Sequence, residues 1–267
     1  MPEPWETTLF TGLIYSNPGV GKTPFAAQLP KPIKVFQFDP PAKALAYRQQ
    51  GFAKPIEYMD DGGAFQFIVD PESKKLLVEI EYFSDSNPTA IATQKHPCSY
   101  ERFQASLQGH MREHWQGYAS VVLDSYTFLE MACVHMQQYK INPAPGGIAD
   151  GGHNQKIWAG QARGVIQTDI MSVFPWIPIH ALVLAHVDEQ RFDEQDTQLW
   201  GISAIGKLGK ILPGAFSEVY YMYKDFNEKE KTEQAYFLTR ENKHIARSDL
   251  RVPSPCKASW EALWKRS

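Results

Sequence analysis

Residues 12–23 read GLIYSNPGVGKT, and this stretch decides the fold. An apolar run ends at Ser16 and passes into a turn that contains two glycines. The pattern of a phosphate-binding loop is GxxxxGK[ST], which this chain matches except that Ser16 replaces the first glycine. Gly19 and Gly21 allow backbone N–H groups to turn inward around phosphate oxygens, and a following helix adds its positive N-terminal end. The stretch therefore predicts a nucleotide site.

The side chains of this loop have separate expected roles. Lys22 places a cation near the β- and γ-phosphates of ATP, and Thr23 offers a hydroxyl to Mg²⁺. The alternative is a chance glycine turn before a helix, but the apolar run before the loop and the predicted helix after it favour a nucleotide site. The residues expected to bind nucleotide are Asn17, Pro18, Gly19, Val20, Gly21, Lys22, Thr23 and Pro24.

The segments around the loop predict an α/β fold. A strand at 12–16, a helix from Gly21 to about Gln28 and a second strand at 33–39 form a βαβ unit, which implies a parallel sheet. Further strands are predicted at 120–124, 179–185, 219–223 and 235–239, and helices at 99–116, 126–139, 155–174 and 259–264. The expected architecture is a mainly parallel sheet flanked by helices.

Three other segments of the sequence differ in character from these strands and helices. Residues 64–83 alternate apolar and polar around Pro71, which predicts a β-hairpin, either an insertion or an edge element of the core. Residues 142–154 are rich in glycine and proline and predict a loop, whereas residues 187–200 are polar and indicate a loop or a short hairpin. One domain over residues 1–267, with this hairpin and a basic C-terminal segment at about 205–267, is the most economical organisation.

Three polar residues end predicted strands, where α/β sheets bind ligands. Asp124 follows VVL and is expected to hold Mg²⁺ through water, although it also suits an N-cap of the next helix. His186 would face the γ-phosphate or serve as a structural histidine. Asp39 would orient or activate the attacking water, or would be a turn residue before Pro40. The candidate catalytic residues are Lys22, Asp39, Asp124 and His186, with Glu57, Asp60 and Asp61 as weaker competitors of Asp39.

Composition limits the classes of protein. The 267 residues are 43% hydrophobic and carry a net charge of −3, which excludes a strongly basic protein that coats nucleic acid. The charge is uneven, because residues 1–200 hold 15 Lys or Arg against 22 Asp or Glu, whereas residues 201–267 hold 12 against 8. Any contact with nucleic acid is therefore expected from a local patch.

Other features indicate an intracellular protein with no membrane partner. The three cysteines form no CxxC pair, so a disulfide framework or a zinc ribbon is not expected. The longest apolar stretch, 173–185, contains two prolines and is too short to span a bilayer. The start of the chain lacks the pattern of a signal peptide, and we expect a cytoplasmic location.

Two basic features near the C-terminus could either bind a ligand or simply be solvated surface. Lys207 and Lys210, in the segment GKLGK, are candidates to contact phosphate in cis or a neighbouring subunit's nucleotide in trans. A candidate patch for the DNA backbone is the cluster of Arg240, Lys243, His244, Arg247 and Arg251. The aromatic residues in or beside the polar loops that are candidates to stack on bases are Trp158, Phe192 and Trp200.

The order NPGVGKT, VFQFD, VVLDSYTFLE, HALVLAHVDEQ and GKLGKILPGAFSEVYYM resembles the RecA-like AAA ATPases encoded by tailed phages. The resemblance covers roughly residues 10–250. It implies ATP and Mg²⁺ as ligands, Lys22 and Thr23 on the nucleotide, Thr23 and Asp124 on the metal, and His186 as a γ-phosphate sensor. Many relatives have a glutamate just after the second strand where this chain has Asp39, which leaves the identity of the catalytic base open.

The same resemblance implies action on single-stranded DNA in phage recombination, annealing or replication. Loops at 142–154 and 187–204 would line the DNA path. The DNA-binding candidates are Lys156, Trp158, Arg191, Arg240, Lys243 and Arg247. Self-association into a ring or filament is expected, with a single-strand binding protein or another replication protein as a further partner, in the cytoplasm of a bacterial host. The alternatives are a nucleotide-gated adaptor, such as a helicase loader, and a small-molecule kinase.

Overall fold

The structure is a computed structural model. It describes residues 9–39, 45–49, 51–54, 57–58, 63–85, 97–141, 155–192, 197–227, 231–240 and 244–264. Its strands are β1 (Thr11–Ser16), β2 (Ile33–Gln37), β3 (Phe52–Ala53), β4 (Glu57–Tyr58), β5 (Gly63–Val69), β6 (Leu76–Phe83), β7 (Ser120–Asp124), β8 (His180–Phe192), β9 (Thr197–Ile202), β10 (Glu218–Asn227), β11 (Thr232–Leu238), β12 (Arg247–Ser248) and β13 (Cys256–Lys257).

The helices are α1 (Lys22–Ala26), α2 (Leu45–Arg48), α4 (Ser99–Arg112), α5 (Tyr126–Ile141), α6 (Gln155–Ile166), α7 (Leu208–Ile211) and α8 (Trp260–Trp264). A π-helical turn, Gln167–Met171, continues α6, and short 3₁₀ turns cover Phe174–Trp176 and Leu212–Ala215. None of the helices in the described ranges is long and apolar enough to cross a bilayer.

The described strands join one sheet in the order β13-β11-β10-β1-β8-β7-β2-β6-β5-β3, with β12 beside β10, β4 beside β5 and β9 beside β8. The middle of this sheet, from β10 to β6, is parallel throughout. The outer strands β5 and β11 are antiparallel to their inner neighbours. The predicted α/β class, a mainly parallel sheet flanked by helices, is confirmed.

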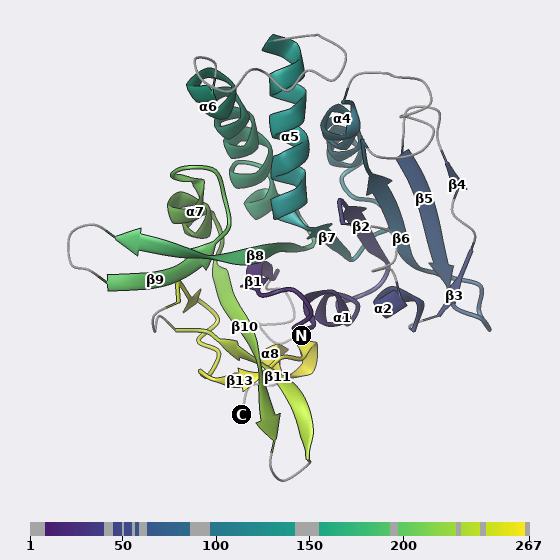
Figure 1. The fold of residues 1–267 in the computed structure, drawn as a ribbon. Coiled ribbons are helices and arrows are strands. Elements are labelled where there is room, and N and C mark those ends of the chain that lie inside the picture. The colour runs from purple at the N-terminus through teal and green to yellow at the C-terminus, as the bar shows by residue number, and fades with distance from the viewer. Residues whose placement is uncertain are drawn as a thin grey trace.

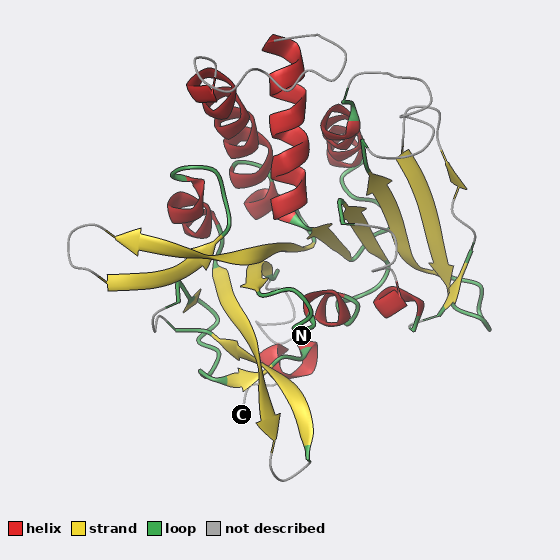
Figure 2. Ribbon diagram, in the orientation of Figure 1, coloured by secondary structure: helices red, strands yellow, loops and turns green. Residues whose placement is uncertain are grey.

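Helices cover both faces of the sheet (Figures 1 and 2). On one face α4, α5 and α6 pack on the strands and bury a core that includes Phe36, Phe103 and Leu129. On the other face α1, α2 and α8 bury a second core that includes Phe25, Tyr47 and Leu263. The alternation of side chains along each strand explains why neighbouring residues belong to different cores.

The order of the central strands positions the site. β8 lies between β1 and β7, with Ser16 paired to His186 and Asp124 paired to Leu184. Because parallel strands point the same way, the carboxyl ends of β1, β8, β7 and β2 meet at one edge of the sheet. The phosphate loop, His186, Asp124 and the residues after β2 therefore converge there.

Several elements differ from their predicted bounds. The helix after the loop is shorter than predicted, because α1 ends at Ala26. The polar segment 187–200 belongs to a hairpin, formed as β8 continues to Phe192 and pairs with β9, so its loop alternative was wrong. The predicted helix at 155–174 is interrupted by the π-helical turn. The segment GKLGK, for which no element was predicted, is partly helical, because α7 begins at Leu208.

The predicted hairpin at 64–83 exists, but half of it belongs to the central sheet. β5 and β6 pair antiparallel, as the alternation predicts. β6 also pairs in parallel with β2, so it is a core strand, and β5 lies outside it. The loop predicted at 142–154 lies outside the described residues. The organisation of residues 1–267 as one domain stays a prediction.

Candidate nucleotide-binding site

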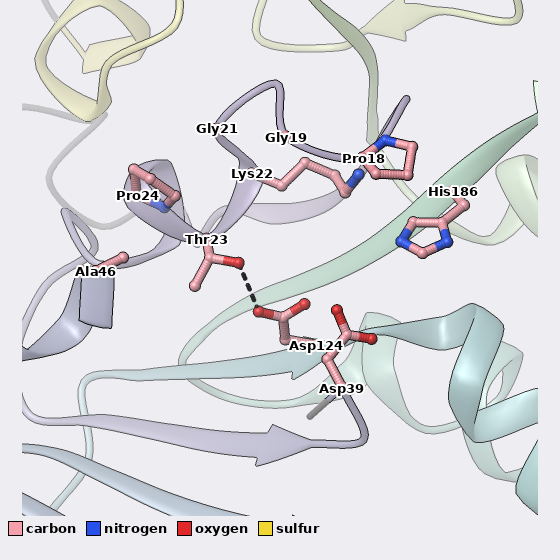
Figure 3. A pocket seen from close by; sticks show the side chains of 10 residues that line it. All are labelled: Pro18, Gly19, Gly21, Lys22, Thr23, Pro24, Asp39, Ala46, Asp124 and His186. Atoms are coloured by element: carbon pink, nitrogen blue, oxygen red, sulfur yellow. Dashed lines mark hydrogen bonds between the residues drawn. The ribbon is translucent and has the colours of Figure 1, made fainter. Parts of the chain in front are cut away.

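A cavity of about 250 Å³ opens at the edge where the parallel strands end. Its lining residues are Pro18, Gly19, Gly21, Lys22, Thr23, Pro24, Asp39, Ala46, Asp124 and His186 (Figure 3). All four candidate catalytic residues are among them. Of the predicted loop residues, Asn17 and Val20 do not line the cavity, and Val20 packs instead against the core beneath α1.

The backbone of the loop explains its two glycines. Gly19 has φ of 79° and Gly21 has φ of 120°, values that L-residues with a side chain rarely adopt. A β-carbon at Gly19 would have no neighbour within 4 Å, so backbone conformation and not space requires glycine there. The turn leads directly into α1 at Lys22.

Lys22 is held in the loop by oxygen atoms. Its Nζ donates to the carbonyl of Ser16 at 3.1 Å, to Ser16 Oγ at 2.9 Å and to the carbonyl of Asn17 at 3.3 Å. Ser16 is fully buried and Lys22 is 8% exposed. These bonds orient the ammonium group within the loop, in the wall of the cavity.

Thr23 and Asp124 come together across the sheet. Thr23 Oγ1 donates to Asp124 Oδ2 at 2.8 Å, although the two residues are 101 positions apart in the chain (Figure 3). Asp124 is the last residue of β7 and is 2% exposed. The hydroxyl and the carboxylate thus bring two oxygen atoms close together, and oxygen atoms are the ligands that a hard cation such as Mg²⁺ prefers.

Asp39 is a second buried carboxylate in the cavity, and Ser125 orients it. Ser125 Oγ donates to Asp39 Oδ1 at 2.9 Å, and the backbone N–H of Phe38 donates to the carbonyl of Asp124 at 2.7 Å. Asp39 is 3% exposed. Two carboxylates therefore face the cavity together with the cation of Lys22.

His186 is the last residue of β8 that pairs with β1, and β8 continues beyond it to pair with β9. Its backbone N–H donates to Thr127 Oγ1 at 3.1 Å, and its ring packs edge-on against Phe128 with centroids 5.8 Å apart. Both contacts come from the first turn of α5. They hold the imidazole in the cavity wall, on the side away from α2 (Figure 3).

Sequence reasoning missed the polar residues behind the cavity. Tyr47 is fully buried, which raises the pKa of its phenol well above the usual value, and Asp124, Tyr82 and Asp39 raise that pKa further. The hydroxyl of Tyr47 and the amide of Gln37 have no hydrogen-bond partner in the structure as described. Alternate residues of a strand lie on the same face, so Gln37, two positions before Asp39, could have been predicted to lie on the side of Asp39. No local pattern in the sequence marks Tyr47 or Ser125.

The other candidate residues whose side chains the structure describes lie outside this cavity. Lys207 and Lys210 are exposed on or beside α7 and do not line the cavity. Arg240 is exposed after β11, and the guanidinium of Arg247 donates to the carbonyls of Phe216 and Gly214. Trp158 is partly buried in α6, and Trp200 is 40% exposed in β9. Lys243 and the side chains of Lys156, Arg191 and Phe192 lie outside the described residues.

The oxygen groups in the cavity could supply only some of the ligands of a bound Mg²⁺. In the described part of the chain no group of three or more His, Cys, Asp or Glu side chains is arranged to hold a metal. Mg²⁺ commonly takes one or two protein ligands and completes its shell with substrate phosphates and water. The pair Thr23 and Asp124 fits that mode of binding.

Known proteins show similarity at the level of family and fold. A search of curated proteins gave no match. The fold is similar to a KaiC-like protein from the archaeon Pyrococcus horikoshii OT3 (TM-score 0.41, 13% identity, 87% of this chain and 78% of the other). It is also similar to the RadB recombinase (TM-score 0.37, 13% identity, 85% and 86%). The family model of an AAA domain matches residues 10–249, which include the phosphate loop, Asp124 and His186. The protein therefore belongs to the AAA domain family.

Proposed function

We propose that this protein is a Mg²⁺-dependent, RecA-like ATPase that acts on single-stranded DNA in phage recombination, annealing or replication. The observation that carries the ATPase part is the 2.8 Å bond between Thr23 Oγ1 and Asp124 Oδ2, in the same cavity as Lys22. A phosphate loop, a strand-end aspartate and a buried lysine are the parts that a phosphate-loop ATPase needs. The membership of the AAA domain family supports this assignment.

In the proposed site, the backbone of Gly19 and Gly21 cradles the phosphates and Lys22 contacts the β- and γ-phosphate oxygens. Thr23 and Asp124 would hold Mg²⁺, which supplies positive charge to the phosphate oxygens when it is bound. Binding of ATP thus places the γ-phosphate between Lys22 and the two buried carboxylates.

Hydrolysis in this site needs a base for the attacking water. The water oxygen forms a bond to the γ-phosphorus, the bond to the bridging oxygen breaks, and ADP leaves with that electron pair. Asp39 would accept the proton of the water, since its carboxylate lines the cavity and Ser125 fixes its orientation.

His186 would sense the γ-phosphate and transmit its presence. Its strand continues without a break into the β8–β9 hairpin, so a shift of the imidazole would be carried to residues 187–204. Single-stranded DNA would be the main partner. Self-association and contact with other replication proteins are part of the same proposal.

The test is the ATPase rate with and without an oligothymidylate, over a series of salt concentrations. We expect DNA to raise the rate, and the concentration of DNA needed to rise steeply with salt because phosphate contacts release counterions. Lys22→Ala should abolish turnover, whereas Lys75→Ala, which removes an exposed lysine in the β5–β6 turn, should not. A wild-type rate that ignores DNA would overturn the DNA part and favour a nucleotide-gated adaptor. Phosphate transfer to a small acceptor would identify a kinase.

A further inference from the structure

The β10–β11 hairpin has one packed face and one face of tyrosines. Met222 and Phe237 point to the packed face, where Phe237 meets Phe25 of α1 edge-on with centroids 4.9 Å apart. The alternation along the strands places Tyr221, Tyr223 and Tyr236 on the other face. At the base of this row Tyr221 packs against the other core and lies 5.4 Å from Tyr15, centroid to centroid. Farther along the hairpin, Tyr223 and Tyr236 lie opposite the side that packs on α1.

The rings of this tyrosine face, defined as Tyr221, Tyr223 and Tyr236, are nearly parallel. The centroids of Tyr221 and Tyr223 are 6.3 Å apart with 7° between the ring planes, and those of Tyr223 and Tyr236 are 5.9 Å apart at 30°. The imidazole of His244 stacks on Tyr221 at 3.7 Å and 22°. The first ring of the row therefore already accommodates a flat heteroaromatic ring on its face.

The helices α4, α5 and α6 do not extend over the β10–β11 hairpin. Figure 1 shows the hairpin extending away from α4, α5 and α6, which lie over the middle of the sheet. The described helices that pack on the hairpin, α1 and α8, contact the face of Met222 and Phe237 and not the face of the tyrosines. Tyr223 and Tyr236 are each partly exposed, so their rings are accessible to a ligand.

Positive side chains border the tyrosine face. Lys257 of β13 pairs with Tyr236, which extends the row Tyr223, Tyr236, Lys257 across three strands. Arg240 lies two residues beyond Leu238, the last residue of β11. Both cations are exposed, and neither forms an ion pair within the described part of the chain. Asp225 is an acidic residue on the same face, near the tip of the hairpin.

We propose that the tyrosine face, together with Lys257 and Arg240, is a binding surface for single-stranded DNA. Unpaired bases stack on aromatic rings whatever their sequence, and lysine or arginine at the border contacts the phosphates. A duplex keeps its bases inside, so it cannot use the rings. This inference rests on the proposed action on single-stranded DNA and names the surface that performs it.

The surface lies on the strand that borders the phosphate loop. Tyr221 pairs with Tyr15, one residue before Ser16, and Met222 Cε lies 3.5 Å from where a β-carbon of Gly21 would be. DNA on one face of β10 and nucleotide beside its other face would therefore share a strand. Any coupling between the two ligands must be reciprocal in their affinities.

The experiment is fluorescence anisotropy of a labelled oligothymidylate with the full chain. Tyr223→Ala combined with Tyr236→Ala should weaken binding at least about tenfold, since each lost stacking contact weakens binding severalfold or more. The variant with phenylalanine at both positions should bind like the wild type, because stacking needs the ring and not the hydroxyl. Affinity for ATP should change less than about twofold in both variants, which shows that they are folded.

The matched control uses the opposite face of the same hairpin. Lys224→Ala combined with Phe226→Ala removes an exposed lysine and an aromatic ring that is 58% exposed there, and it should leave DNA affinity unchanged. If the wild type binds DNA and the tyrosine-to-alanine variant binds equally well, the surface is wrong while the proposed function stands. Equal affinity for a duplex would also overturn the surface. A wild type that binds no single-stranded DNA would overturn the proposed function itself.

Discussion

Ser16 stands where the common phosphate-loop pattern has a glycine, and its side chain is used in the loop. Ser16 Oγ accepts a bond from Lys22 Nζ at 2.9 Å and donates to the carbonyl of Asn17 at 2.8 Å. Because Ser16 ends β1 as an ordinary strand residue, this position does not need the conformational freedom of glycine. The departure from the pattern adds a bond to the lysine and leaves the turn at Gly19 and Gly21 unchanged.

At the same scale, Glu130 makes stability depend on pH. Burial raises the pKa of this carboxyl from 4.5 to about 6, against the opposing bonds from the Ile205 N–H and the Tyr126 hydroxyl. A raised pKa means that the folded state binds the proton more tightly than the unfolded state does. The contribution of this proton to the stability of the fold is therefore complete below pH 4.5 and is lost as pH rises through 6. A shift of this size corresponds to ~2 kcal/mol of unfolding free energy.

We therefore expect Glu130→Gln to remove that part of the pH dependence. The measurement is urea unfolding at pH 4.5 and pH 7, and the loss of stability between these values should be ~2 kcal/mol smaller in the variant than in the wild type. Glu113→Gln, at an exposed position after α4, should keep the wild-type difference. Equal pH dependence in Glu130→Gln and the wild type would contradict the assignment.

At the scale of elements, the sequence predicted which polar residues follow or end the strands at the site, but not which residues contact them. Asp39, Asp124 and His186 were expected at one edge because parallel strands point the same way, and all three line the cavity. The bond from Ser125 to Asp39 and the burial of Tyr47 depend on contacts between segments far apart in the chain. Local patterns carry no information on such contacts.

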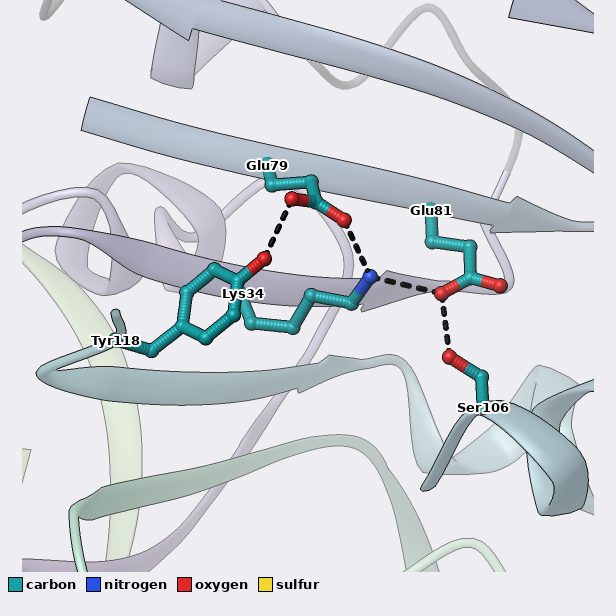
Figure 4. Close-up of polar contacts among 5 residues, drawn as sticks. All are labelled: Lys34, Glu79, Glu81, Ser106 and Tyr118. Atoms are coloured by element: carbon teal, nitrogen blue, oxygen red, sulfur yellow. Dashed lines mark hydrogen bonds and ion pairs between the residues drawn. The ribbon is translucent and has the colours of Figure 1, made fainter. Parts of the chain in front are cut away.

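The β5–β6 hairpin shows the same limit. Alternating polar and apolar residues predicted it correctly, but its parallel pairing with β2 was missed. Glu79 and Glu81 occupy polar positions of that alternation, yet both contact the buried ammonium of Lys34 in β2, at 2.7 and 2.8 Å (Figure 4). A charged partner on another strand makes burial of these residues tolerable.

Removal of Lys34 should therefore destabilise the junction of β2 and β6. Lys34 is 1% exposed, and Lys34→Met would leave the buried carboxylate of Glu81 and the partly buried carboxylate of Glu79 without their cation. We expect a loss of ~3–5 kcal/mol in the free energy of unfolding, measured by urea denaturation at pH 7. The network lies near the start of β2, away from the phosphate loop, so the variant that remains folded should bind ATP normally.

A charge-matched control separates electrostatics from packing. In the triple variant Lys34→Met, Glu79→Gln and Glu81→Gln, no charge is left buried, and the amide oxygens still accept bonds from Tyr118 and Ser106 (Figure 4). This variant should recover most of the lost stability. If it is as unstable as Lys34→Met alone, the loss reflects packing of the lysine chain and not the uncompensated carboxylates.

At the scale of the whole molecule, the uneven charge corresponds to a division of the sheet. The C-terminal residues 201–267, with 12 basic against 8 acidic side chains, supply α7, the β10–β11 hairpin and the outer strand β13. The acidic remainder supplies the other parallel strands and the cavity. We infer that contacts with anionic partners concentrate on the side of the sheet beyond β1.

Lys207 and Lys210 provide the test of assembly. Both are exposed and do not line the cavity of their own chain, so we expect them to act on the nucleotide of a neighbouring subunit. Lys207→Ala combined with Lys210→Ala should then be inactive alone, as Lys22→Ala is. An equal mixture of the two inactive proteins should regain about a quarter of the wild-type ATPase rate, because one random head-to-tail contact in four joins an intact loop to intact lysines. A mixture in which the Lys22→Ala protein also lacks both lysines should stay inactive. Action in cis predicts no recovery in either mixture, and full activity of the double variant alone would remove these lysines from the mechanism.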